Sequence, residues 1–327
     1  MGTFVVSLDF ELHWGVRDHR TVAGYHENLL GVRQVVPALL SLFSEFGIHA
    51  TWATVGFLFF ESRDELLAAL PVERPHYVDR KLDPYAALDE IGKDENGDPF
   101  HFAPTLIRMI QATPDQEIAT HTFSHYYVGD PGPSLESFRA DIHAAKLAGR
   151  RFGIEIKSIV FPRNQVTIPH VGVCAEEGLI AYRGVESDLY VAAGSGLVNR
   201  GRRFVDSYVN LAGACCGVPK EMDGLKIVSV PQSRFLRPYD RQLGLLDGLR
   251  LHRILSSMTF AAQNQLLFHL WWHPHNFGAN TDLNISFLRA ILENYKQLEQ
   301  RFEFQSATMG EVAESVLANS VAACRAS

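Results

Sequence analysis

The sequence predicts an α/β barrel made of one compact domain that spans residues 1–327. Short apolar segments alternate with amphipathic helical segments along most of the chain, which is typical of βαβ units and a mainly parallel sheet. The chain length suits one such barrel with added loops. Polar residues capable of chemistry also stand where the predicted strands end, as they do at the carboxyl-terminal face of α/β barrels.

The elements follow from the period of the apolar residues, which is close to 2 in strands and 3.6 in helices. The expected strands are residues 4–9, 49–55, 117–120, 158–161, 181–183, 227–231, 266–271 and 302–305. The expected helices are residues 32–46, 66–70, 106–110, 135–152, 171–177, 249–264, 285–300 and 309–317. Ser134 and Ser137 suit a capped start of the fourth helix, and Gly153 suits its end.

Two stretches interrupt the alternation and are predicted to be loop insertions. Residues 71–104 carry repeated prolines, and residues 185–225 carry repeated glycines. Loops of this length inside a compact domain are usually functional. We expect both at one mouth of the barrel.

Composition limits the class of partner. The formal net charge is −7 and the pI is about 6.0, so no general attraction for nucleic acid or for an anionic membrane is expected. No apolar run is long enough to be read as a membrane-spanning segment. The sequence shows no signal peptide, and its four cysteines form no CxxC motif, so we expect reduced thiols and a cytoplasmic protein. The oligomeric state is not predicted.

Several strand ends carry side chains that suit hydrolytic chemistry. Asp9 and Glu11 stand two residues apart at the end of the first strand, so both should lie on one face. His121 and His125 follow the third strand at i, i+4 spacing, which places two imidazoles on one side of a helical turn. The remaining candidates are Arg163 and Asn164 after the fourth strand, and His273 and His275 after the seventh.

These ordered motifs resemble those of the polysaccharide deacetylases, carbohydrate esterase family 4, which have the NodB-homology fold. The match runs from Phe4 to about Gln305, and its clearest part is His121-Thr122-Phe123-Ser124-His125. The resemblance implies a distorted (β/α)7–8 barrel with long loop insertions. The acidic residues here are separated as Asp9-Phe10-Glu11, whereas the family commonly has adjacent aspartates.

The resemblance also implies a role for each residue. Glu11, His121 and His125 would bind one divalent metal ion, with zinc expected, and Asp9 would be the catalytic base, although the roles of the two carboxylates can be exchanged. His273 would be the general acid, with His275 as an alternative. Arg163 and Asn164 would orient the base, or the backbone near them would stabilise an oxyanion.

The positions of other side chains in the sequence suggest further roles for them. Trp14, Trp272 and His275 are candidates for a rim that stacks on a sugar. Arg139 and Asp141 are interpreted as part of a solvated helix face.

Together these residues predict a metal-dependent hydrolase that removes an N-acetyl or other N-acyl group from an amino sugar of a glycan or glycan precursor. The partner would be a carbohydrate substrate. One alternative is a C–N hydrolase of the same fold that acts on a formamido sugar or another non-peptide amide. Another is a carbohydrate-binding protein without turnover, which would have no need of both a base and an acid.

Overall fold

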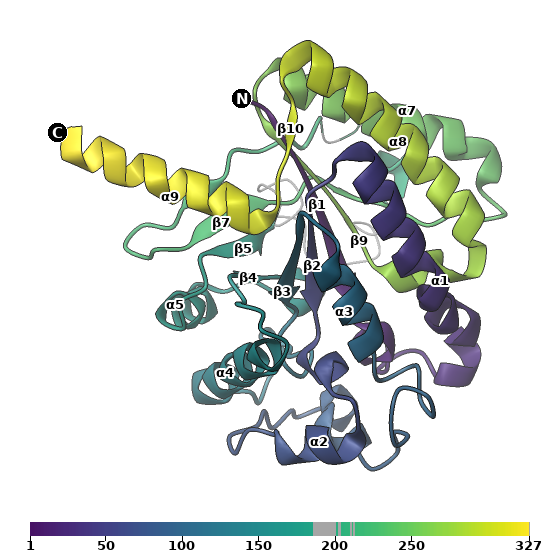
Figure 1. Ribbon diagram of the computed structural model, residues 1–327, viewed down its shortest axis with the longest axis vertical. Coiled ribbons are helices and arrows are strands. Elements are labelled where there is room, and N and C mark those ends of the chain that lie inside the picture. The colour runs from purple at the N-terminus through teal and green to yellow at the C-terminus, as the bar shows by residue number, and fades with distance from the viewer. Residues whose placement is uncertain (186–200, 202–203, 210, 212, 327) are drawn as a thin grey trace.

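The structure is a computed structural model that describes every residue except 186–200, 202–203, 210, 212 and 327. Within that part of the chain, ten strands form one curled sheet with helices around it (Figure 1). The strands are β1 (Thr3–Phe10), β2 (Ala50–Thr54), β3 (Gln116–Thr120), β4 (Ser158–Ile159), β5 (Ala181–Gly184), β6 (Lys220–Glu221), β7 (Val228–Pro231), β8 (Arg234–Phe235), β9 (Leu267–Trp272) and β10 (Gln305–Ser306). The helices are α1 (Val22–Phe46), α2 (Arg63–Ala68), α3 (Pro104–Ala112), α4 (Leu135–Arg151), α5 (Ile168–Glu176), α7 (Asp247–Gln263), α8 (Thr281–Phe302) and α9 (Met309–Ala326).

The strand order is β6-β7-β5-β4-β3-β2-β1-β9-β8, and β10 pairs with the start of β1. The described pairs are parallel except for β6 with β7. Between β7 and β8 the chain connects the two sides of the sheet: Gln232 N donates to Gly184 O (3.1 Å), and Ser233 N donates to His269 O (2.9 Å). The sheet is therefore a curled half-barrel, which confirms the expected distorted barrel.

Side chains of β1 alternate between two environments, as the pleat of a strand requires. Phe4 and Val6 belong to the large core beneath the surrounding helices. Val5 belongs to a second apolar cluster inside the barrel, which also includes Met309 of α9. The N-terminal end of the barrel holds this apolar cluster and is covered by α9 (Figure 1), whereas the candidate site residues lie at the opposite end.

Most expected elements are confirmed, and the differences have local causes. Helix α1 begins at Val22 rather than at residue 32, because Thr21 caps a first turn that is mostly exposed and carries no apolar period. Ser134 and Ser137 form the expected cap of α4. The last expected strand, residues 302–305, is shorter and begins later, as β10 at Gln305, because α8 continues through Phe302. The strands β6 and β8 have two residues each, too few to show a period.

The first predicted insertion is irregular, with only two short 3-10 turns, Arg80–Leu82 and Tyr85–Ala87, before α3 begins. Much of the second predicted insertion, including residues 186–200, lies outside the described residues.

One helix in the described part of the chain, α1, has the length and apolar composition to cross a membrane. Half of its most apolar 18-residue window is buried within the fold, where Leu39 and Phe43 are fully shielded from solvent. Such burial is typical of a core helix, and it agrees with the prediction that the chain has no membrane-spanning segment.

Candidate metal centre and active site

Polar side chains collect at the carboxyl end of β1, on the face that points into the barrel. Ser7 and Asp9 follow Val5 on that face, and Glu11 lies just beyond the strand. Asp9 and Glu11 are each 3% exposed. One atom, His273 Nε2, lies 3.6 Å from both Asp9 Oδ2 and Glu11 Oε1. The two carboxylates therefore converge as expected.

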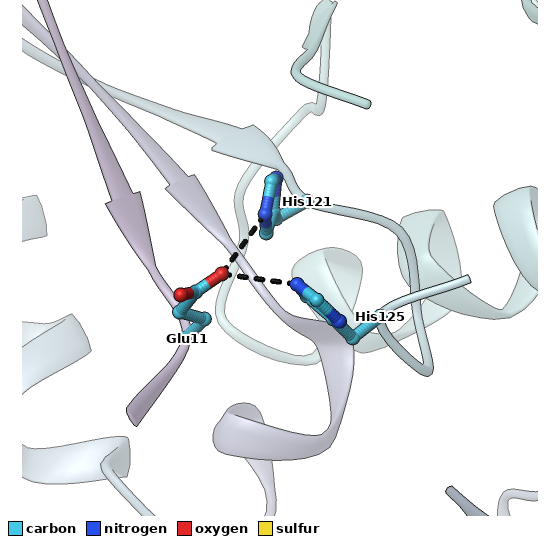
Figure 2. Close-up of side chains that lie close together, drawn as sticks. All are labelled: Glu11, His121 and His125. Carbon is cyan, nitrogen blue, oxygen red and sulfur yellow. Dashed lines mark hydrogen bonds and ion pairs between the residues drawn. The ribbon is translucent and has the colours of Figure 1, made fainter. Parts of the chain in front are cut away.

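Glu11, His121 and His125 form a buried cluster of metal-ligand atoms (Figure 2). Glu11 Oε2 lies 3.1 Å from His121 Nε2 and 3.0 Å from His125 Nε2. His121 Nδ1 lies 2.8 Å from Val160 O; this contact requires the ring proton on Nδ1 and leaves the Nε2 lone pair facing the cluster. Two imidazole nitrogens and one carboxylate oxygen form a donor set that suits zinc.

The charges of the cluster also suit a divalent ion. Burial alone would raise the pKa of Glu11, but His273, His121 and His125 outweigh it and hold that pKa well below its usual range. Burial lowers the pKa of His125, even though Glu11 acts in the opposite direction. A charged carboxylate and a neutral imidazole are the protonation states that metal binding requires, so the residues present fit the predicted ion.

The two histidines converge without a helix, contrary to the expectation from their spacing. Residues 121–125 form a non-helical turn after β3. The backbone φ is 65° at Thr122 and 59° at His125, so both residues are in the left-handed region. Thr122 Oγ1 accepts a hydrogen bond from Tyr126 N (2.7 Å). The chain reverses here, and the reversal brings both rings to one side.

A glycine leaves space for the Glu11 carboxylate. Glu11 is followed by the 3-10 turn Leu12–Gly15. A Cβ atom at Gly15 would lie 1.9 Å from Glu11 Cδ, far inside any allowed contact. Gly15 therefore permits the Glu11 conformation that reaches both histidines.

Asp9 is held by an arginine that the sequence analysis did not select. Arg183, at the end of β5, donates from Nη1 to Asp9 Oδ1 (2.6 Å) and from Nη2 to Asp9 Oδ2 (2.8 Å). Burial would raise the pKa of Asp9, but the Arg183 guanidinium, together with His121 and His273, outweighs burial and lowers this pKa. Asn164 Oδ1 accepts from Arg183 Nη2 (2.9 Å) and Nε (3.2 Å), so Asn164 holds the guanidinium that binds Asp9.

The predicted role of Arg163 as the cation that orients Asp9 is wrong. Arg163 Nη2 pairs with Asp18 Oδ2 (2.5 Å), and Nη1 pairs with Asp130 Oδ2 (3.3 Å). Its guanidinium lies over the ring of Tyr127, 4.1 Å from the centroid. Its backbone φ of 56° is part of the turn after β4 that directs the side chain to these acids. Arg183, which ends a strand predicted at residues 181–183, could have been found by the same search of strand ends.

The predicted oxyanion donors near this turn are already engaged. Asn164 N donates to Phe161 O (2.9 Å), and Gln165 N donates to Pro162 O (3.2 Å). Both bonds close the 3-10 turn Pro162–Asn164. These two N–H groups therefore serve the turn.

His273 and His275 both point inward, at different depths. His273 has a side chain that is 24% exposed, and it faces the two carboxylates. His275 is 3% exposed, and its Nε2 lies 4.0 Å from Glu11 Oε1. Burial and the nearby His273 lower the pKa of His275 to about 3, so this ring is neutral. His273 is therefore the solvent-accessible histidine beside both carboxylates, whereas the prediction of His275 at a substrate rim is wrong.

The two tryptophans predicted at the rim are buried. Trp14 and Trp272 are both fully shielded; Trp14 Nε1 donates to His101 O (2.9 Å), and Trp272 stacks on Phe277. Each belongs to the main core, so neither prediction holds. Trp271 and Phe235 are part-exposed aromatic residues beside the site, and their ring centroids lie 5.8 Å and 5.7 Å from that of His273.

Comparisons with known proteins rest on structure alone. No family model matches the sequence, and no curated protein matches it. Solved structures do resemble the chain, at low sequence identity, and three of them are described next.

A putative polysaccharide deacetylase from Mycobacterium smegmatis has a TM-score of 0.60 at 15% identity, covering 98% of this chain and 92% of its own. A probable polysaccharide deacetylase from Pseudomonas aeruginosa PAO1 has a TM-score of 0.53 at 12% identity, covering 95% and 89%. The Puue allantoinase has a TM-score of 0.54 at 12% identity, covering 95% and 88%. Likeness at this identity concerns the fold, and the chain therefore has a fold of the NodB polysaccharide-deacetylase type.

Proposed function

We propose that this protein is a metal-dependent hydrolase that removes an N-acetyl, or another N-acyl, group from an amino sugar of a glycan or glycan precursor. The observation that carries the proposal is that two carboxylates, close together in space, have different partners. Glu11 lies among two histidine nitrogens, and Asp9 is held by Arg183. His273 faces both.

In this proposal each residue of the site has a specific role. Glu11, His121 and His125 would hold a divalent ion, which when bound supplies Lewis acidity and lowers the pKa of water. Asp9, kept ionised by Arg183, accepts the proton of the attacking water. His273, beside both carboxylates and open to solvent, donates a proton to the departing nitrogen. Trp271 and Phe235 border His273 and offer an apolar wall to the substrate.

The comparisons support the carbohydrate class of substrate. Two of the three similar structures reported above are described as polysaccharide deacetylases. The third is described as an allantoinase, a reminder that the fold accommodates other C–N bonds. The assay must therefore distinguish between acyl groups and between substrates.

The test combines metal content with product release. Purified protein is assayed for acetate, formate and ammonia release on N-acetylated and N-formylated amino sugars and a cyclic ureide. The sugars are supplied as monosaccharide, oligosaccharide and lipid-linked precursor, so that the assay covers both finished glycans and glycan precursors. We expect one divalent ion per chain and acetate release. Formate or ammonia alone would favour the alternative, and full activity of metal-free protein in chelator would contradict the proposal.

Variants separate the two carboxylate sites. Asp9→Asn should keep the ion and lose about 10²–10⁴-fold in kcat, the usual contribution of a general base. His125→Ala should lose both the ion and the activity. His49 lies outside the cluster, 2.9 Å from Glu311, and His49→Ala is the matched control that should keep both. Sugar binding by wild type with no product would point to a binding protein instead.

A further inference from the structure

The turn that carries the two histidine ligands is held from outside. Thr122 and His125 occupy the left-handed region of φ, which non-glycine residues enter only when their surroundings impose it. The turn is part of no helix or strand, so beyond its internal hydrogen bond at Thr122 its shape depends on the contacts that residues 122–124 make with other segments. Two neighbouring segments make those contacts.

On one side lies the carboxylate of Asp141, a residue of α4 that is fully buried. Asp141 Oδ1 accepts from Phe123 N (2.6 Å). Asp141 Oδ2 accepts from Ser124 N (3.2 Å) and from Ser124 Oγ (2.5 Å). Both carboxylate oxygens therefore bind the two residues in the middle of the turn.

Asp141 has no ion-pair partner in the described part of the chain, and burial raises its pKa to about 7 against the hydrogen bonds of the turn. A buried carboxyl without a cation is costly. The donors that satisfy it come from Phe123 and Ser124. The hydrogen bonds from the turn therefore explain why this carboxyl is buried, which the packing of α4 alone does not explain.

On the other side lies the start of the 3-10 turn Gly56–Phe59. Gly56 N donates to Thr122 O (2.9 Å), and Phe57 N donates to Phe123 O (3.0 Å). A Cβ atom at Gly56 would lie 2.5 Å from Phe123 Cδ2. The turn is therefore clamped between the end of β2 and α4, with Asp141 as the clamp on the α4 side.

We infer that Asp141 is a positioning residue of the metal centre. By fixing the Phe123 and Ser124 backbone, it sets the separation and direction of His121 and His125, so that both Nε2 atoms meet Glu11 Oε2. This inference rests on the metal site of the proposed function. Residues that orient metal ligands typically contribute 10–100-fold to metal affinity, and we expect an effect of this size.

The chain offers a matched control at the other end of β3. Glu117 also anchors neighbouring groups, accepting from Thr51 Oγ1 (2.7 Å), Ser158 Oγ (2.5 Å) and Gly310 N (3.0 Å). It lies at the start of the strand, away from the histidines. Glu117→Gln should therefore weaken the fold without changing metal affinity.

The experiment measures the zinc dissociation constant by competition with a chromophoric chelator, for wild type, Asp141→Asn, Asp141→Ala and Glu117→Gln. Circular dichroism identifies a temperature at which each variant used is folded. The cobalt(II) absorption spectrum reports the ligand geometry. We expect both Asp141 variants to bind zinc about 10–100-fold more weakly with an altered cobalt spectrum, and Glu117→Gln to match wild type.

Three outcomes would overturn the inference. A folded Asp141→Asn with wild-type affinity and spectrum would show that the turn holds itself. Equal weakening in Glu117→Gln at equal loss of stability would show a general effect of destabilisation. Wild type that binds no zinc would refute the proposed metal site first, which distinguishes that failure from a failure of the Asp141 inference. If Asp141→Ala does not fold, the zinc affinity and cobalt spectrum of Asp141→Asn test the inference.

Discussion

At the scale of single residues, two carboxylates two positions apart have different partners. Asp9 faces across the barrel to Arg183, and Glu11 faces the histidines of the turn after β3. Burial would raise both pKa values, and different cations or rings lower them. The exchange of roles that the sequence leaves open is therefore decided in the proposal by these neighbours, with Glu11 as the metal ligand.

Replacement of Arg183 tests whether Asp9 acts as the base in the proposed reaction. Because the guanidinium holds the pKa of Asp9 down against burial, Arg183→Met should raise that pKa and move the acidic limb of kcat/KM to higher pH. Loss of one partner of a buried pair should also cost about 3–5 kcal/mol of unfolding free energy. Since a lowered pKa stabilises the fold above the unfolded pKa of about 3.9 and this contribution is lost as the pH falls through the folded pKa, the loss should be larger at pH 7 than near pH 3. Kinetics and urea unfolding at several pH values measure both.

Arg163→Met is the control for this experiment, because Arg163 pairs with Asp18 and Asp130 at the rim. The acidic limb of kcat/KM for Arg163→Met should match that of wild type. An unchanged limb in Arg183→Met would mean that ionisation of Asp9 does not limit the reaction.

At the scale of elements, α1 fixes the segment that carries His273. The 3-10 turn Pro274–Asn280 follows this histidine, and Asn28 Nδ2 of α1 donates to His275 O (3.0 Å). The two segments touch backbone to backbone: a Cβ atom at Gly31 would lie 2.4 Å from Gly278 O. Helix α1 therefore packs against the segment that carries the candidate general acid, in addition to covering the sheet.

Gly31→Ala should disturb this contact. Although alanine normally favours a helix over glycine, the new methyl group must displace backbone, at a cost of about 1–3 kcal/mol in unfolding free energy. We expect kcat to fall while metal content stays at the wild-type level, because the ligands lie on other elements. Calorimetry, metal analysis and kinetics measure these effects.

Gly172→Ala provides the comparison, since a Cβ atom at this α5 position meets nothing within 4 Å. It should stabilise the protein by about 0.5–1 kcal/mol. If Gly31→Ala is likewise stabilising and fully active, α1 does not place His273.

At the scale of the whole molecule, the three candidate metal ligands come from parts of the chain that are distant in sequence. Glu11 follows β1, and the two histidines follow β3. An ion bound to all three should stabilise the folded state, because the unfolded chain does not hold these groups together.

Zinc at 100 times its dissociation constant should raise the unfolding free energy by about 2.7 kcal/mol. Calorimetric scans with zinc and with chelator measure this shift. His121→Ala should remove it, whereas His49→Ala should keep it. An equal shift in His121→Ala would place the stabilising ion at another site.

Much of this protein follows from short-range sequence patterns. Alternating apolar periods determine the strands and most helices, since each period needs only neighbouring residues. The spacing Asp9, Glu11 places two carboxylates on one face, and the strand-end rule brings His121, His125 and His273 to the same end of the barrel. Very short elements such as β8 cannot be predicted in this way, because two residues are too few to show a period.

Tertiary structure decided the rest, for one physical reason: pairing across the barrel depends on how far the sheet curls, and no local spacing encodes that curl. It decided that Arg183 on β5, and not Arg163, reaches Asp9. It buried Trp14 and Trp272. It also turned Asp141, interpreted from the sequence as part of a solvated helix face, into the buried carboxylate that holds the turn between the two histidines.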